Sequence, residues 1–208
     1  MKCPLCSSFL SQKIDNEYFD CGNCRALIKD PAFYIDAEQE KAFYELHNND
    51  VHDEGYQNFT SPITNYVLTQ YQPQDRGLDF GSGTGPVISK VLKDNGFNNV
   101  FQYDPFFCPN DEALNQTYDF IFSCEVVEHF HFPFDEYERL FNMLKSAGRL
   151  LIMTHPYDGK VPFENWYYRK DPTHVFIHRK ETFEFIARKF GATIEFEGER
   201  LTVFKKME

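Results

Sequence analysis

Short apolar runs alternate with amphipathic segments over most of the chain, and this alternation predicts strands that are each followed by a helix. Four apolar runs have the length of buried strands: 77–80, 100–103, 118–123 and 149–154. Apolar residues at helical spacing predict four helices: 63–71, 87–95, 135–146 and 179–190. Two alternating segments, 193–197 and 201–204, predict a final antiparallel hairpin. This order is typical of an α/β fold around a mostly parallel sheet.

The first 34 residues follow a different pattern, which predicts a separate small unit. Two C-x-x-C pairs, Cys3 with Cys6 and Cys21 with Cys24, flank a segment that predicts a hairpin. Four thiolates on two tight turns suit a tetrahedral Zn²⁺, and so short a segment needs such a staple to fold. Two reduced redox pairs or disulfides are the alternative, but no strand–helix pattern of thioredoxin type surrounds either pair. With four ligands and no open position, the zinc would be structural.

The segment between this unit and the first strand of the sheet predicts a helical linker. Asp36 and Gln39 have the spacing of a capping box for a helix over 37–47, which 48–50 would end. Ser61-Pro62 then predicts the start of the next helix. The expected organisation is therefore a zinc ribbon over 1–34, a linker over 35–60 and an α/β domain over 61–208.

Composition and charge narrow the class of partner. The 208 residues allow one α/β domain and a small appendage, and 42% of them are hydrophobic, so a substantial core can form. The 21 basic and 32 acidic residues give a net charge of −11, which disfavours nucleic acid as a partner without excluding it. No charged-then-apolar leader and no apolar run of about 18 residues is present. We therefore expect a soluble, cytoplasmic protein that does not contact membranes, in which cysteines are thiols or metal ligands.

The strongest local signal is the turn after the first predicted strand. The strand contains Asp79, and Gly81, Gly83 and Gly85 alternate after it, with Pro86 before the next helix. Glycines allow a ligand close to the backbone, and the helix N-terminus offers free N–H groups. The spacing departs from the dinucleotide pattern G-x-G-x-x-G, because Pro86 stands where the third glycine would be. It resembles motif I of the class I S-adenosylmethionine-dependent methyltransferases.

The resemblance implies a Rossmann-like sheet with S-adenosylmethionine bound at its carboxyl edge. Asp104 ends the second strand, where an acid can bind the two ribose hydroxyls. The implied cofactor-binding residues are Asp79, Gly81, Ser82, Gly83, Gly85, Asp104, Pro105, Cys124 and Glu125. Only 105–117 separates the second and third strands, so the helix and edge strand that the family places there are shortened. The acid that reads adenine is then uncertain between Asp111 and Glu112, and Phe106 or Phe107 would stack on the base.

A second motif follows the third predicted strand. Glu125, Glu128 and His129 have the spacing of one helical face, and two carboxylates with an imidazole can bind Mg²⁺ or Mn²⁺. E-V-x-E-H resembles the motif of ubiquinone-type O-methyltransferases, and the segment from His174 resembles one in small-RNA 2′-O-methyltransferases. The resemblance implies Glu125, Glu128, His129 and His174 as catalytic residues and tentative ligands of the divalent metal. Alternatively, these residues line the pocket without a metal, and His129 is the general base.

These observations favour O-methylation of a small polar or aromatic metabolite. The aromatic segment 166–168 would contact the acceptor, and Arg169 would pair with an anionic group on it. Metal-assisted 2′-O-methylation of RNA is one alternative. A non-catalytic module that senses S-adenosylmethionine or binds partners through the zinc ribbon is another. His155 and His178 are expected to be simply hydrogen-bonded, and Cys108 and Cys124 to be buried thiols.

Overall fold

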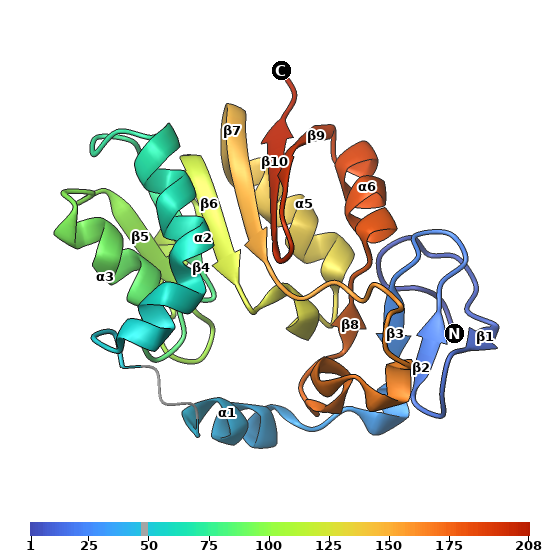
Figure 1. Ribbon diagram of the computed structural model, residues 1–208. Coiled ribbons are helices and arrows are strands. Elements are labelled where there is room, and N and C mark those ends of the chain that lie inside the picture. Colours follow the sequence, from blue (N-terminus) through green and yellow to red (C-terminus); the bar gives the residue numbers. More distant parts are fainter. Residues whose placement is uncertain (47–49) are drawn as a thin grey trace.

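The computed structural model describes residues 1–46 and 50–208 (Figure 1). Its centre is a six-stranded sheet in the order β5-β4-β6-β7-β10-β9. The strands are β4 (Gly77–Phe80), β5 (Val100–Tyr103), β6 (Tyr118–Cys124), β7 (Leu144–Met153), β9 (Ala192–Glu197) and β10 (Leu201–Lys206). The first four are parallel, and β10 is antiparallel to both β7 and β9. The predicted α/β, Rossmann-like architecture is confirmed, with β5 at one edge because the connection after it is short.

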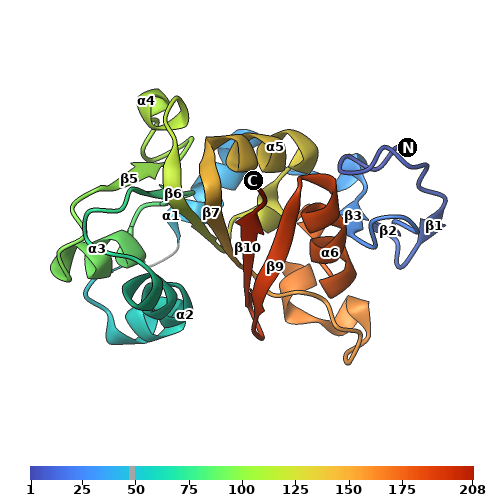
Figure 2. The same cartoon turned by 90° about the horizontal axis from the view of Figure 1, so that it is seen from above.

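Helices cover both faces of this sheet (Figure 2). The longer ones are α2 (Glu54–Gln70), α3 (Val87–Asp94), α5 (Pro133–Met143) and α6 (Lys180–Lys189). Successive strand residues point to opposite faces, so Phe120 and Phe122 pack with α2 and α3, whereas Ile121 packs with α5 and α6. Within the described residues, no helix is both long and apolar enough to cross a membrane.

Helix α2 begins earlier than the sequence predicted. Asp53 caps it by accepting from the Tyr56 N–H, and Pro62 lies inside the helix, so a start at Ser61 is wrong. Burial of one side of α2, including Ile63 and Val67, offsets the backbone hydrogen bond that Pro62 removes. The expected boundary after residue 60 therefore falls within this helix. The capping box of α1 (Ala37–Glu45) is confirmed, whereas the predicted last helical residue, 47, and the break predicted after it at 48–49 lie outside the described residues.

Helix α5 ends earlier than predicted, and β7 begins at once after it. The predicted helix to residue 146 with Gly148 as its cap is wrong, because Leu144 already pairs with Tyr118 of β6. Gly148 is in contact with β6 at this point. A Cβ on it would lie 3.1 Å from the Asp119 carbonyl oxygen.

The N-terminal unit is joined to the rest of the chain through a second, smaller sheet. Its strands β1 (Gln12–Lys13), β2 (Tyr18–Asp20) and β3 (Leu27–Lys29) are antiparallel, and β8 (Phe176–Ile177) adds to β3. Figure 1 shows β8 beside β3, although the two strands lie far apart in the sequence and the whole of the central sheet up to β7 comes between them. We call residues 1–34 the ribbon. The sheet of the ribbon therefore includes β8, a strand that begins two residues after His174.

Candidate functional site

A cavity of about 810 Å³ opens at the carboxyl ends of β4, β5 and β6. This is the edge at which open parallel sheets bind ligands, and the volume is within the range of small-molecule sites. Its wall has two sides. The turns after β4 and β5 form one side, and the other is formed by the turn after β6, by α1 and by residues of 167–174. We call these the cofactor side and the acceptor side.

The turn after β4 requires glycine for two separate reasons. Gly81 has φ +84°, and a Cβ on it would lie 2.4 Å from Cγ2 of Val126. The Gly81 and Ser82 N–H groups donate to the Tyr103 carbonyl at 2.8 and 3.1 Å, which fixes the turn against β5. Gly81, Ser82 and Gly83 line the cavity, as the sequence predicted for a cofactor site.

Asp104 organises the cofactor side. One carboxylate oxygen accepts the Gly83 N–H at 2.9 Å, and the other accepts the Phe106 and Phe107 N–H groups at 2.8 and 2.9 Å. Asp104 is buried and still lines the cavity, as do Pro105, Phe106 and Phe107. The oxygen that accepts only the Gly83 N–H keeps a second lone pair, so Asp104 can hold the turn and still accept from a ligand.

Not every predicted cofactor residue is in the wall. Within the described residues, Asp79 and Gly85 lie behind the turn, where Asp79 accepts from Ser89 Oγ at 2.6 Å and burial raises the pKa of Asp79 to about 7. Asp111 and Glu112 are exposed in the first turn of α4 (Asp111–Leu114), also outside the wall. Cys124 lines the cavity, and burial raises its thiol pKa.

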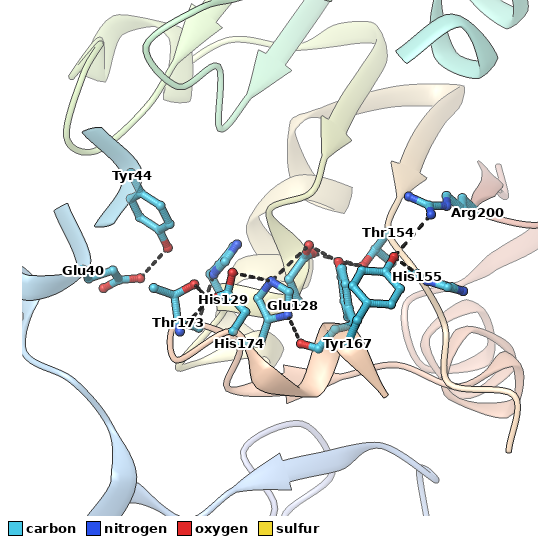
Figure 3. A network of polar contacts seen from close by, with 12 residues as sticks. Glu40, Tyr44, Glu128, His129, Thr154, His155, Tyr167, Thr173, His174 and Arg200 are labelled. Atoms are coloured by element: carbon cyan, nitrogen blue, oxygen red, sulfur yellow. Dashed lines mark hydrogen bonds and ion pairs between the residues drawn. The ribbon is translucent and has the colours of Figure 1, made fainter. Parts of the chain in front are cut away.

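His129 and His174 line the acceptor side, and Glu128, which is not among the lining residues, lies buried beside them (Figure 3). One potential ligand atom from each lies within 4.8 Å of the other two. Glu128 is wholly buried, and its carboxylate accepts from Thr154 Oγ1 at 3.0 Å and from the Tyr168 hydroxyl. His129 is the last residue of the 3₁₀ turn η2 (Val127–His129). His174 is distant in sequence and lies in the segment after η4 (Tyr167–Lys170).

The hydrogen bonds of the two imidazoles fix their tautomers. His129 Nδ1 lies 3.1 Å from the Thr173 carbonyl and His174 Nδ1 lies 2.7 Å from the Tyr168 carbonyl. A carbonyl only accepts, so Nδ1 bears the proton in each ring and Nε2 keeps its lone pair. Burial lowers the pKa of His129 and lowers that of His174 to about 3, so both rings are neutral near pH 7. Two neutral nitrogens and a carboxylate can hold a divalent cation or receive a proton.

Glu125 is separate from this cluster. It has φ +53° and its N–H donates to the Met153 carbonyl, so it precedes the turn that contains Glu128 and His129. The predicted single helical face is therefore wrong. Glu125 still lines the cavity, and in the described part of the chain its Oε1 has no hydrogen-bond partner. Burial and the neighbouring Glu128 raise the pKa of Glu125 to about 8, and burial raises that of Glu128 to about 7.

The aromatic segment has a role that the sequence did not indicate. Trp166 is buried against Phe163 and Tyr157, whereas Tyr167 is exposed and lines the cavity. Arg169 forms ion pairs with Asp15 and Glu17 of the ribbon at 2.9 and 3.0 Å. The prediction that Arg169 pairs with an anionic group of the acceptor is wrong, because these carboxylates already occupy its guanidinium.

Several residues of the acceptor side were missed from the sequence. Glu40 and Tyr44 of α1 line the cavity, and the Tyr44 hydroxyl donates to Glu40 at 2.6 Å. Thr154 and Tyr168 bind Glu128. The position of Thr154 directly after β7 was a usable signal, because it too lies at the carboxyl edge of the sheet. His178 is buried and bonded to the Tyr137 hydroxyl, and His155 to that of Tyr167, as expected.

The four ribbon cysteines form a compact cluster with free thiols. The Sγ atoms of Cys3 and Cys24 are 3.6 Å apart, and those of Cys6 and Cys21 are 3.5 Å apart. A disulfide requires about 2.05 Å. Metal–sulfur bonds of about 2.3 Å in a tetrahedron place sulfurs roughly 3.8 Å apart, so the cluster fits one tetrahedral ion.

Comparison with known proteins agrees with the fold. A family model described as a methyltransferase domain matches residues 52–195. No curated protein matches the sequence. A Haloferax volcanii protein solved in complex with a methyltransferase activator has 15% identity and a TM-score of 0.59, over 81% of this chain and 97% of that one. Magnesium protoporphyrin IX methyltransferase of Synechocystis PCC 6803, solved with S-adenosylmethionine, has 15% identity and a TM-score of 0.55. The match covers 84% of this chain and 94% of that one.

Proposed function

Because the chain belongs to the methyltransferase-domain family, we propose that this S-adenosylmethionine-dependent methyltransferase methylates a hydroxyl of a small polar or aromatic acceptor. One observation supports this choice above others. Two neutral histidines, His129 and His174, lie beside the buried carboxyl of Glu128 in the same cavity as the glycine turn. Such a group suits an acceptor that must lose a proton before it attacks.

The turns after β4 and β5 would hold the cofactor. Asp104 would accept the ribose hydroxyls, the 81–83 turn would contact the methionine end, and Phe106 or Phe107 would cover the base. Tyr56 and Phe59 of α2 also line the cavity and would contact the methionine end. A cofactor held in this way would direct its methyl group toward the acceptor side.

Methyl transfer from a sulfonium is an in-line displacement, and alignment can contribute roughly 7–11 kcal/mol to the rate. The residues of the acceptor side would orient the hydroxyl and, through a bound cation, ease the loss of its proton to solvent. A buried histidine with a low pKa is a weak proton acceptor, but its lone pair remains available to a cation. Glu128, His129 and His174 would hold a divalent ion such as Mg²⁺ or Mn²⁺. A bound ion would lower the pKa of the acceptor hydroxyl.

The charges around the cavity support a small acceptor rather than a polyanion such as RNA. The acids in its wall are Glu40, Asp104, Glu136 and Asp171, together with Glu125, which its raised pKa of about 8 keeps largely neutral near pH 7. Arg139 also lines the cavity, but it donates to Glu136 at 2.9 Å. A chain of phosphates would meet these acids at close range.

The ribbon adds a second proposed metal. The spacing of the four sulfurs supports a structural Zn²⁺ on Cys3, Cys6, Cys21 and Cys24, with no position left for a substrate.

Two measurements test the function. S-adenosylhomocysteine is titrated calorimetrically into chelator-treated protein, and micromolar binding is expected. Transfer of a labelled methyl group from S-adenosylmethionine is then measured on panels of phenols, catechols, amines and short RNAs, with and without Mn²⁺. Label on hydroxyl acceptors, lost in Glu128→Gln but kept in Glu112→Gln, supports the proposal. Glu112 gives the control because it lies exposed outside the cavity. Label on amines or RNA alone would refute it.

A further inference from the structure

The segment 172–175, which includes His174, is enclosed between the ribbon and the turn after β6. On the inner side, the Val175 N–H donates to the Glu128 carbonyl at 2.9 Å, and His129 Nδ1 donates to the Thr173 carbonyl. These bonds connect the segment to Glu128 and His129, the other two members of the cluster. The ribbon makes the contacts on the outer side.

Three carbonyls of this segment accept hydrogen bonds from ribbon residues. The Tyr18 hydroxyl donates to the His174 carbonyl at 2.6 Å, and Lys29 Nζ donates to the Pro172 carbonyl at 2.8 Å. The Lys29 backbone N–H donates to the Val175 carbonyl at 2.9 Å, and the β3–β8 ladder continues from there. Tyr18 and Lys29 are 0% and 3% exposed, so water does not replace these donors. A carbonyl left without a donor there would be costly.

Ion pairs hold both ends of the same stretch. Arg169 pairs with Asp15 and Glu17, and both Nη atoms of Arg179 reach Asp20 at 2.9 Å. The bidentate geometry of the Arg179 pair restricts orientation as well as distance. The ribbon thus contacts the stretch at its two ends and along its middle.

We propose that the ribbon positions His174 for methyl transfer, with Tyr18 and Lys29 as positioning residues that act through the backbone of 172–175. His174 lines the cavity, whereas Tyr18 and Lys29 are not among the lining residues, and their side chains bond to backbone carbonyls of this segment. The ribbon is therefore a built-in part of the acceptor side rather than an appendage. The role assigned to His174 rests on the proposed function.

The test compares amide hydrogen exchange and the ring ¹H–¹⁵N spectrum of His174 in the full-length, zinc-loaded chain. Tyr18→Phe removes one hydroxyl, and Lys29→Met removes the Nζ donor. Tyr157→Phe is the matched control. Tyr157 packs against the same aromatic cluster as Tyr18, but its hydroxyl donates to the Val161 carbonyl and not to the segment 172–175. We expect Val175 exchange to rise roughly tenfold in both test variants, as for one lost buried hydrogen bond. We also expect the His174 ring to lose its single Nδ1–H tautomer.

Two results would overturn the inference. One is that the exchange rate of the Val175 amide and the ring spectrum of His174 are the same in both test variants as in the control Tyr157→Phe. The other is faster exchange throughout, including Ile121 and Phe122 of β6, which would show that the ribbon supports the whole fold and not this segment. Failure of the proposed function would look different, because the wild-type protein would then not bind S-adenosylhomocysteine at all.

Discussion

Replacing Asp104 by Asn tests the cofactor side most directly. Asp104 accepts three backbone N–H groups, those of Gly83, Phe106 and Phe107. The Asn side chain keeps the shape but has only one accepting oxygen, so one set of N–H groups must face an NH₂ group instead. The turn after β4 or the turn after β5 then loses its anchor.

The magnitude follows from two contributions. Hydrogen bonds to a charged group are worth about 1.5–3 kcal/mol each, and the proposed ribose contacts lose that charge. Adding the loosened turn, we expect a loss of about 3 kcal/mol, which is about 150-fold in Kd for S-adenosylhomocysteine. Isothermal titration calorimetry measures this range when the wild-type Kd is micromolar.

Asp111→Asn is the control for this experiment. It makes the same chemical change in the exposed first turn of α4, so its Kd should stay within about twofold of wild type. Melting temperatures of both variants establish that each is folded at the assay temperature. A Kd within threefold of wild type for folded Asp104→Asn would refute the ribose assignment.

Three further predictions address other parts of the chain. Gly81→Ala should weaken S-adenosylhomocysteine binding by calorimetry, because its Cβ would lie 2.4 Å from Val126 Cγ2 at φ +84°, and Val126→Ala should restore part of the loss. Native mass spectrometry should find one zinc per chain, and a chelator or Cys24→Ser should remove it and lower the melting temperature. Burial lowers the pKa of His178 to about 3, so below pH 6.5 this residue binds its proton more readily in the unfolded chain and its contribution to stability falls as the pH drops. Urea unfolding should show that, between pH 6.5 and pH 4, the wild type loses on the order of 3 kcal/mol of stability relative to His178→Gln.

The features that the sequence predicted correctly are local. The glycine turn, the acid at Asp104 and the sulfur pairs of the ribbon depend on residues close together along the chain. The α/β fold class followed as well, because apolar strands alternate with amphipathic helices along the chain. The carboxyl edge of the sheet then indicated where Glu128 and His129 would lie.

The features that the sequence did not predict depend on contacts between distant residues. Tyr18 and His174 meet only because β8 adds to the ribbon sheet, and two residues form too short a strand to give a pattern. The pairing of Arg169 with Asp15 has the same cause. Pro62 indicated a helix start by local preference, but tertiary packing of α2 outweighed that preference.

Because one side of the cavity depends on local contacts and the other on distant ones, the two sides should differ in how sensitive they are to mutations elsewhere in the chain. The cofactor side is one continuous strand–turn–helix unit with the neighbouring β5 turn, so its geometry depends on few residues. The acceptor side combines α1, the turn after β6 and a segment fixed by the ribbon. Changes in the ribbon or α1 can therefore alter acceptor choice while cofactor affinity is kept. The bond from Val175 to the Glu128 carbonyl links the segment that the ribbon contacts to the turn after β6, and it is where such changes would first affect the reacting groups.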